Sequence, residues 1–120
     1  MTQEDKELIH RDLCARLSYG VKGNYQNSDD ELLRKVTIMY RYLEPGGMVM
    51  TGDIKPYLFL ISSMTEKQRE EERHLKEELY SFDADGNVFT LQDFYYKNHI
   101  DFRGLIPMDL AIDATGLNIY

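Results

Sequence analysis

The stretch Ser81-Phe-Asp-Ala-Asp-Gly-Asn-Val-Phe-Thr-Leu-Gln92 decides how the second half of this chain folds, because it joins two segments with helical patterns. Its central Asp-Ala-Asp-Gly sequence predicts a tight turn in which Gly86 adopts a positive φ. Asp83 and Asp85 before this glycine, with Val88 after it, also fit the middle of a helix–loop–helix calcium loop. The stretch is therefore either an ion site or a turn that resembles one.

In the calcium interpretation, the ligands are the carboxylates of Asp83 and Asp85 and the main-chain carbonyl of Asn87. The first position of such a loop is Ser81 here and the twelfth is Gln92, so both ends lack the usual carboxylate. We therefore expect any calcium affinity to lie well below that of calcium sensors. The ordinary turn is the favoured interpretation, and no cofactor is expected.

The segment before this turn is the clearest predicted helix. Thr65 and Gln68 match a capping box, and residues 66–80 are rich in strong helix formers. The apolar stripe of this helix is short and consists of Leu75, Leu79 and Phe82. We expect this C-terminal half to be packed and the first two turns to stand in solvent.

The segment after the turn predicts a second, shorter helix. Thr90 with Asp93 matches an N-terminal cap, and the helix should end near Asn98. Its aromatic residues Phe94 and Tyr95, with Leu91, are expected to close over the preceding helix. The tail that follows alternates weakly between apolar and polar residues, which favours a short strand near residues 110–112.

The N-terminal part begins with a predicted helix over residues 2–17. Thr2 and Asp5 form a capping pair, and the apolar residues recur at one-turn spacing. A first strand is expected at residues 20–26, followed by a polar turn at residues 27–30. This end of the chain therefore contributes one helix and one strand to the core.

Residues 32–43 fit two different structures. Ser28 and Glu31 would form a capping box for a helix whose stripe runs from Leu32 to Leu43. The run Val36-Thr-Ile-Met-Tyr-Arg-Tyr42 is instead dense in β-branched and aromatic residues, which favour a pleated strand. We favour the strand and keep the helix as the alternative.

The middle of the chain completes the predicted fold. A hairpin turn at residues 44–47 leads into an expected strand at 48–51, and residues 52–61 follow as a connector interrupted by Pro56. We expect this connector to cross the core and to lead into the next helix. The chain is predicted to be one α+β domain over residues 1–120, with an N-terminal helix, a small antiparallel β-meander, two C-terminal helices and an extended tail.

The composition limits the classes of function. The chain has 120 residues and a net charge of −7, and residues 77–120 hold eight acidic residues against Lys97 and Arg103. Because phosphate backbones need a basic surface, direct nucleic-acid binding is not expected. The apolar runs are too short for a membrane helix, and the charged N-terminus does not resemble a signal peptide. We therefore expect a cytoplasmic protein without membrane partners.

Two groups of side chains could carry chemistry. The residues around the start of the tail combine aromatic surfaces with both charges and could bind a polar ligand or a partner peptide; they are Tyr95, Tyr96, His99, Asp101 and Arg103. The structural alternative is an Arg103–Asp101 pair, with Phe102 and Leu105 anchoring the turn. His10 and Cys14 share a helix face, but no third residue that would orient a catalytic pair is indicated.

Three blocks of the sequence resemble a family of small uncharacterised proteins found in gut anaerobic bacteria and their mobile elements. The blocks are Asp12-Leu-Cys-Ala-Arg-Leu-Ser-Tyr-Gly-Val-Lys22, Lys55-Pro-Tyr-Leu-Phe-Leu-Ile-Ser-Ser-Met-Thr65 and His99-Ile-Asp-Phe-Arg-Gly-Leu-Ile-Pro-Met-Asp-Leu-Ala-Ile112. The resemblance implies a single-domain protein in a bacterial cytoplasm. The family has no established activity, so the resemblance supplies no catalytic residues.

The leading functional hypothesis is a non-catalytic interaction or regulatory protein that binds a protein partner. It uses the acidic C-terminal third and exposed aromatic residues, and it is favoured because no catalytic constellation is found. The alternative is a ligand- or ion-binding protein that uses the loop at Asp83–Asn87 or the Tyr95–Arg103 cluster.

Overall fold

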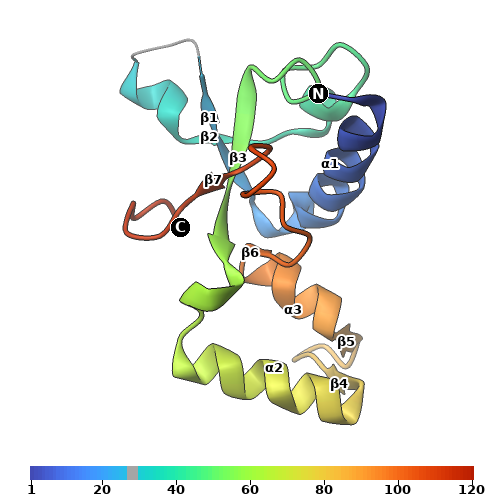
Figure 1. Cartoon of the computed structure of the whole chain (residues 1–120). Helices are drawn as coiled ribbons and strands as arrows, with labels where there is room; N and C mark the ends of the chain where they lie inside the picture. The colour runs from blue at the N-terminus through green and yellow to red at the C-terminus, as the bar shows by residue number, and fades with distance from the viewer. Residues whose placement is uncertain (27–29) are drawn as a thin grey trace.

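The computed structural model describes residues 1–26 and 30–120 and has the predicted α+β class (Figure 1). Within these residues the helices span Gln3–Arg16 (α1), Glu66–Glu78 (α2) and Leu91–Lys97 (α3). The strands span Lys22–Tyr25 (β1), Val36–Thr37 (β2), Ile54–Leu60 (β3), Tyr80–Phe82 (β4), Val88–Thr90 (β5), Ile100–Asp101 (β6) and Ile112–Asp113 (β7). The N-terminal helix and the two later helices are therefore confirmed.

Strand β3 is the centre of the larger sheet. β1 pairs antiparallel with Ile54–Pro56, and β2 pairs antiparallel with the other side of β1. β7 and then β6 pair in parallel with the second half of β3. Two of the predicted antiparallel strands are thus present in shortened form, as β1 and β2. The tail adds two short parallel strands, of which β7 overlaps the strand expected near residues 110–112.

The prediction of a mere connector at residues 52–61 is wrong, because Ile54–Leu60 forms this seven-residue strand. Ile54, Tyr57 and Leu58 are buried along it. Pro56 lies where β3 changes its partner from β1 to β7. A proline lacks the N–H group that would donate a hydrogen bond to a neighbouring strand. The sheet tolerates this loss at a position where the partner strand changes.

Residues 32–51 differ most from the prediction. In place of a long strand or a helix, the two-residue strand β2 lies between 3₁₀ turns at Glu31–Arg34 and Tyr40–Leu43. The expected strand at 48–51 is wrong, since Thr51 donates its N–H to the Gly47 carbonyl at 3.0 Å within consecutive turns. The chain packs so closely here that residue 47 has to be a glycine. A Cβ on Gly47 would lie 2.6 Å from the Tyr42 carbonyl oxygen. The predicted polar turn at residues 27–30, and the Ser28 cap, fall largely outside the described residues.

Helix α1 begins as predicted. The Thr2 hydroxyl accepts a hydrogen bond from the Asp5 N–H, and the Asp5 carboxylate accepts one from the Thr2 N–H. Such a box satisfies N–H groups that the first helical turn cannot satisfy itself. Ile9 and Leu13 are buried, so this helix covers the sheet with one face.

Helix α2 also begins at the predicted capping box, between Thr65 and Gln68. Leu75 is its one buried residue, which confirms that the first turns stand in solvent. The expectation that Leu79 and Phe82 complete the apolar stripe is wrong, because 76% and 63% of these side chains are exposed. The helix ends at Glu78, and the chain turns away through Leu79, whose φ is 67°.

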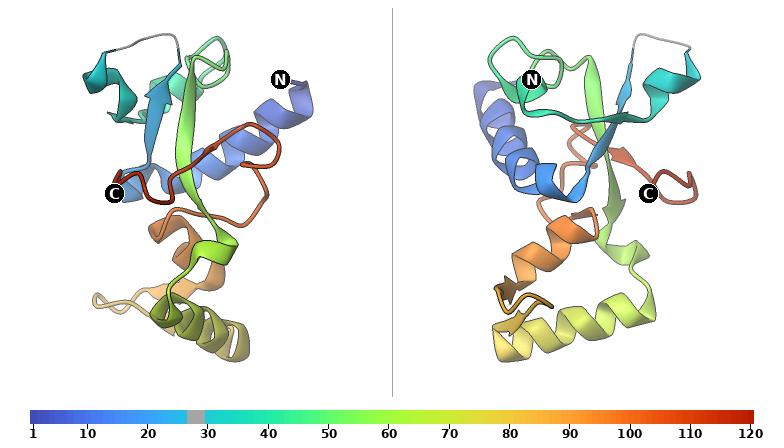
Figure 2. Two further views of the ribbon diagram at one scale, coloured as in Figure 1. Left: turned by 60° about the vertical axis from the view of Figure 1, so that its left-hand side comes forward. Right: turned by 180° about the vertical axis from the view of Figure 1, so that it is seen from behind.

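The elements form two parts, each around a hydrophobic cluster, and a third, small cluster joins the tail to β3 through Tyr57, Ala114 and Ile119. The larger cluster lies between α1 and the sheet and includes Leu13 and Leu58. The smaller cluster holds α2 and α3 together around Leu75, Phe94 and Ile100, which confirms that α3 packs on α2. Figure 2 shows this second part below the sheet, connected through β3 and β6. Within the described residues, no helix has both the length and the apolar character needed to cross a membrane.

Candidate functional site

The predicted binding cluster lies at the junction between the two parts of the molecule. Tyr95 and Tyr96 come from α3, His99 from the turn after it, and Asp101 from β6. No more than 8% of any of these four residues is exposed. The structure therefore brings the cluster together, but as a buried junction, and its role in binding a ligand stays a prediction.

A buried charge network ties this junction to α1. The Arg16 guanidinium donates to both carboxylate oxygens of Asp12, at 2.8 and 3.1 Å, and both residues are fully buried. Arg16 also donates to the Ile100 carbonyl at 2.7 Å and to the Tyr95 carbonyl at 3.3 Å. The network satisfies a guanidinium that would otherwise be costly to bury.

The Arg103–Asp101 pair expected from the sequence is wrong. Arg103 donates to Asp12 at 2.6 Å and to the Tyr96 hydroxyl at 3.0 Å. Asp101 instead accepts the backbone N–H groups of Leu105 and Ile106, each at 2.8 Å. Both Asp101 oxygens are thus directed at its own turn, and Asp12, 91 residues away, is the carboxylate that pairs with Arg103.

His99 is the unusual member of the junction. Its φ is 57°, and its ring stacks on that of Tyr120 with the centroids 3.7 Å apart. Burial and the nearby Arg16 charge lower the pKa of His99 to about 4, so the ring is neutral at pH 7. Its Nδ1 atom is buried and has no hydrogen-bond partner in the described part of the chain. The Tyr120 hydroxyl donates to the Tyr57 carbonyl at 2.7 Å and so fastens this end of the tail to β3.

The loop around Asp83 is a hairpin turn and not the middle of a helix–loop–helix unit. The strands β4 and β5 flank it and pair from Tyr80↔Thr90 to Phe82↔Val88. The Asp83 Oδ1 atom accepts the N–H groups of Asp85 and Asn87, each at 2.9 Å. These bonds, with the Asn87 N–H foremost, lower the pKa of Asp83. In residues 1–26 and 30–120, no three histidine, cysteine or acidic side chains come together as a metal site.

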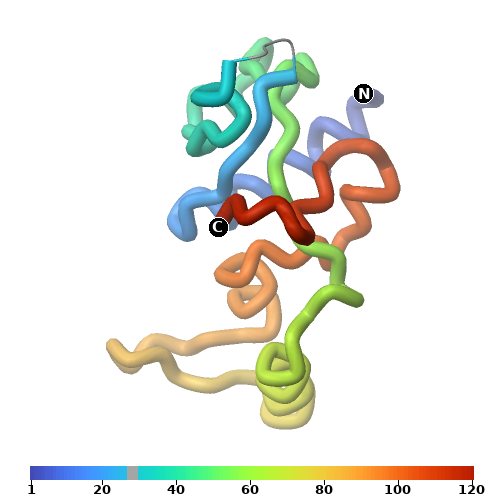
Figure 3. The backbone as a smooth tube through the Cα atoms, turned by 90° about the vertical axis from the view of Figure 1, so that its left-hand side faces the viewer, coloured from blue at the N-terminus to red at the C-terminus, as the bar shows by residue number. Residues whose placement is uncertain are grey.

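This hairpin presents an apolar face that the sequence reasoning missed. Cross-strand partners share a face, so Tyr80 and Phe82 lie beside Val88, while Phe89 points the other way, into the smaller core. Tyr80, Phe82 and Val88 are 52%, 63% and 57% exposed. The Tyr80 and Phe82 rings are in edge-to-face contact, 5.7 Å between centroids. Figure 3 shows the hairpin projecting from the end of α2.

The hairpin itself carries charge of one sign, whereas His74 and Lys97 line the hollow beside its Phe82 and Asp83. Between residues 77 and 96 the chain has five acidic residues and no basic residue. Glu77 forms an ion pair with Arg73, but Glu78, Asp83 and Asp85 are exposed next to the apolar face. The hairpin therefore combines apolar side chains with a negative border.

The outer edge of β4 is open for pairing. Asp83 donates its N–H to the Asn87 carbonyl at 2.9 Å, so these residues form a hydrogen-bonded pair. Because such pairs alternate along antiparallel strands, Phe82↔Val88 and Tyr80↔Thr90 are non-hydrogen-bonded pairs. The N–H and C=O groups of Tyr80 and Phe82 consequently point away from β5, and β4 pairs with no other described strand.

The predicted proximity of His10 and Cys14 is confirmed, but the thiol is not activated. The Cys14 Sγ atom lies 3.7 Å from the nearer ring nitrogen of His10. Burial raises the pKa of the Cys14 thiol, which keeps it protonated at pH 7. The pair therefore lacks the thiolate that a nucleophilic cysteine needs.

Comparison with known proteins identifies no relative. No protein-family model matches the chain, and no curated protein or solved structure matches it either. The function is therefore argued from the geometry and charge of the surfaces described above.

Proposed function

We propose that this protein is a non-catalytic interaction module whose hairpin β4–β5 binds an extended, basic segment of a partner protein. The observation that carries the proposal is the exposure of Tyr80, Phe82 and Val88 together on one hairpin face. A two-stranded hairpin is marginally stable alone in water, and contiguous apolar side chains in solvent are typical of contact surfaces. A partner that covers this face would bury three large side chains at once.

The charge of the hairpin selects the partner. Glu78, Asp83 and Asp85 surround the apolar face, and residues 77–96 contain no basic residue. Lysine or arginine beside apolar residues would complement this surface and accelerate association. A second copy of the chain fits poorly, since it would bring the same acidic border and a net charge of −7. The favoured occupant is thus a basic protein segment.

The open edge of β4 supplies the mode of binding. An extended segment can add a strand to this edge and pair with the outward N–H and C=O groups of Tyr80 and Phe82. Alternate side chains of that segment would then lie over the hairpin face, and the others would reach the acidic border. In this arrangement the main-chain hydrogen bonds give affinity, and the alternating apolar and basic side chains of the bound segment give specificity.

A nuclear magnetic resonance titration tests this proposal. The probe is a short blocked peptide in which lysine alternates with valine or isoleucine, and its counterpart has glutamate in place of lysine. We expect the basic peptide to shift the amide signals of residues 79–90, with weaker binding at higher salt because exposed charges are screened. The acidic counterpart should leave these signals in place.

Matched variants connect the binding to the hairpin face. The double variant Tyr80→Ser, Phe82→Ser should lose most of the peptide-induced shifts while the other amide signals stay in place. Leu32→Ser removes a side chain that is 81% exposed at a distant 3₁₀ turn and should bind as the native chain does. The proposal fails if both peptides bind equally, if the shifts map elsewhere, or if sedimentation shows the chain to dimerise through this hairpin.

A further inference from the structure

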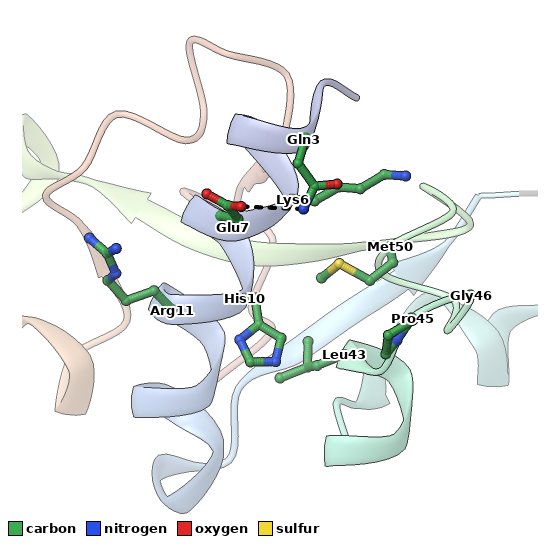
Figure 4. A pocket seen from close by; sticks show the side chains of 9 residues that line it. All are labelled: Gln3, Lys6, Glu7, His10, Arg11, Leu43, Pro45, Gly46 and Met50. Carbon is green, nitrogen blue, oxygen red and sulfur yellow. Dashed lines mark hydrogen bonds between the residues drawn. The ribbon is translucent and has the colours of Figure 1, made fainter.

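A separate cavity of about 510 Å³ lies between the first three turns of α1 and the loop that follows Leu43 (Figure 4). It is larger than the hollow of about 290 Å³ between α2 and the hairpin. Its volume falls within the range of small-molecule sites, roughly 300–1,000 Å³. It uses neither the buried junction nor the hairpin face.

The floor of this cavity is apolar and the loop beside it is tightly built. Leu43 and Met50 line it and are 1% and 8% exposed, and Pro45 lies between them along the chain. The loop is held by consecutive backbone hydrogen bonds, including Gly47 N–H to the Glu44 carbonyl at 2.8 Å and Val49 N–H to the Tyr42 carbonyl at 3.0 Å. The wall is thus preformed, and a methionine on the floor can adapt to the shape of a ligand.

The opposite wall is polar and carries a cation without a partner. Gln3, Lys6 and His10 follow one another at helical spacing and face the loop. The Lys6 ammonium forms no ion pair or side-chain hydrogen bond within the described part of the chain. In Figure 4 the Lys6 side chain extends over the loop, whereas Arg11 extends to the other side of the helix.

The one acidic residue of the lining is already engaged. The Glu7 carboxylate accepts a hydrogen bond from the Gln3 amide at 3.3 Å, on the helix side of the cavity. A bound anion would therefore meet Lys6 and the His10 ring before it met this carboxylate. A bound cation would meet the like charge of Lys6 on the same wall.

We infer that this cavity binds a small organic monoanion with an apolar body, such as an aryl-substituted or medium-chain carboxylate. The carboxylate lies at Lys6, with the His10 ring beside it, and the apolar body lies on Leu43, Pro45 and Met50. A charge-assisted hydrogen bond fixes the polar end, and burial of the apolar end supplies the remaining affinity. This site does not depend on the hairpin proposal, because the two surfaces share no residue.

The test compares three probes of one shape that differ in charge: 4-phenylbutyrate, its neutral amide and 4-phenylbutylamine. Binding is followed by calorimetry and by the amide signals of residues 3–11 and 43–50. We expect the acid to bind with a dissociation constant in the range of about 0.1–1 mM. The amide and the amine should bind at least about fivefold more weakly, since a bond to a charged group is lost.

A charge-matched pair of variants locates the site. Lys6→Gln should weaken the binding of 4-phenylbutyrate at least about fivefold. Lys67→Gln makes the same change on the exposed surface of α2 and should leave the affinity within about twofold. The inference is overturned if the acid causes no shifts at about 10 mM, if amide or amine binds as well as the acid, or if the two variants behave alike.

Discussion

Asp12 is the residue on which the junction between the two parts of the molecule depends. It is fully buried and accepts hydrogen bonds from Arg16, on its own helix, and from Arg103, which lies 91 residues further along. One carboxylate is therefore the shared ion-pair partner of two guanidinium groups. Removal of that charge leaves a fully buried cation, Arg16, and a partly buried cation, Arg103, without their shared anion. An uncompensated buried charge is strongly destabilising.

We predict that Asp12→Asn lowers the free energy of unfolding by about 3 kcal/mol or more. The asparagine keeps the shape but cannot compensate the two positive charges. Asp109→Asn is the control, because its ion pair with Lys55 involves a carboxylate that is 90% exposed, and its loss should cost less than about 1 kcal/mol. Urea unfolding followed by circular dichroism measures both, and equal losses would show that the network contributes little.

His99 makes the stability of the fold depend on pH. Its pKa is about 4 in the folded chain, against the ordinary histidine value of 6.5 in the unfolded chain. The unfolded chain therefore binds the extra proton first, and this stabilising contribution is complete above pH 6.5 and is lost as the pH falls toward 4. The contribution amounts to at most about 3 kcal/mol.

We predict that the His99 ring signals titrate below pH 5 in the folded protein, as measured by nuclear magnetic resonance. In His99→Asn, whose residue type tolerates the positive φ, unfolding free energy should fall less between pH 7 and pH 4.5 than in the native chain. The carboxylates titrate in both proteins, so their contribution to the pH dependence cancels in the comparison. A His99 ring that titrates near 6.5 would contradict the buried neutral state.

At the level of elements, the hairpin β4–β5 joins two well-formed helices but is itself poorly covered. Only Phe89 points into the smaller core, while Tyr80, Phe82 and Val88 stand in solvent. Leu79 introduces the hairpin with a φ of 67°, a conformation that costs a non-glycine residue roughly 1 kcal/mol or more. The chain thus keeps a strained, exposed leucine at the entry to its proposed contact surface.

We predict that Leu79→Gly raises the free energy of unfolding by up to about 1 kcal/mol, because glycine adopts this helix-ending conformation without strain. Thermal unfolding measures the gain. Leu79→Ala keeps the positive φ with a smaller side chain and should give no comparable stabilisation. A glycine variant that is less stable than the alanine variant would mean that the leucine side chain contributes packing after all.

The turn of this hairpin also limits its use as an ion site. One carboxylate oxygen of Asp83 accepts the N–H groups of Asp85 and Asn87. Ser81 and Gln92, at the first and twelfth positions of a calcium loop, offer no carboxylate. We predict no calorimetric heat from calcium at about 1 mM, which is the weak end of the range of extracellular calcium modules. Heat that disappears in Asp83→Ala would instead establish a calcium site here.

The elements that the sequence predicted well are those whose signals are local. The capping boxes at Thr2, Thr65 and Thr90 begin the three helices where they were expected. The strand β3 was missed because Pro56 breaks its local pattern, and only its partners in the fold show why the proline is tolerated. The Arg103–Asp12 contact spans 91 residues, and no local spacing encodes it. The exposure of Phe82 was missed because a helical stripe was extended past the true helix end.

The whole molecule is elongated, with principal extents of 43, 29 and 27 Å. The three blocks that resemble a bacterial family supply Asp12 and Arg16, the strand β3, and the segment from His99 to β7, which are the elements that meet between the two parts. The kinship to that family stays a prediction. The hairpin and α2 lie outside these blocks, at the far end of the molecule.

We predict that the two parts of the molecule open with different free energies. The smaller core contains four buried residues, whereas the larger core contains twelve, so the α2 region has less apolar burial to lose. In hydrogen exchange under native conditions, amides of α2 and β4 should exchange faster than those of β3. The same exchange rate in both segments would show that the chain unfolds as a single cooperative unit.

The pairing of β3 also has a consequence for synthesis of the protein on the ribosome. The first half of β3 pairs with residues 22–25, but its second half waits for residues 100–101 and 112–113. A nascent chain that ends before these residues emerge exposes an apolar strand with an unpaired edge, which is a template for aggregation. Folding of this sheet therefore waits until these residues have emerged, and truncation before residue 113 should yield insoluble protein instead of a smaller domain.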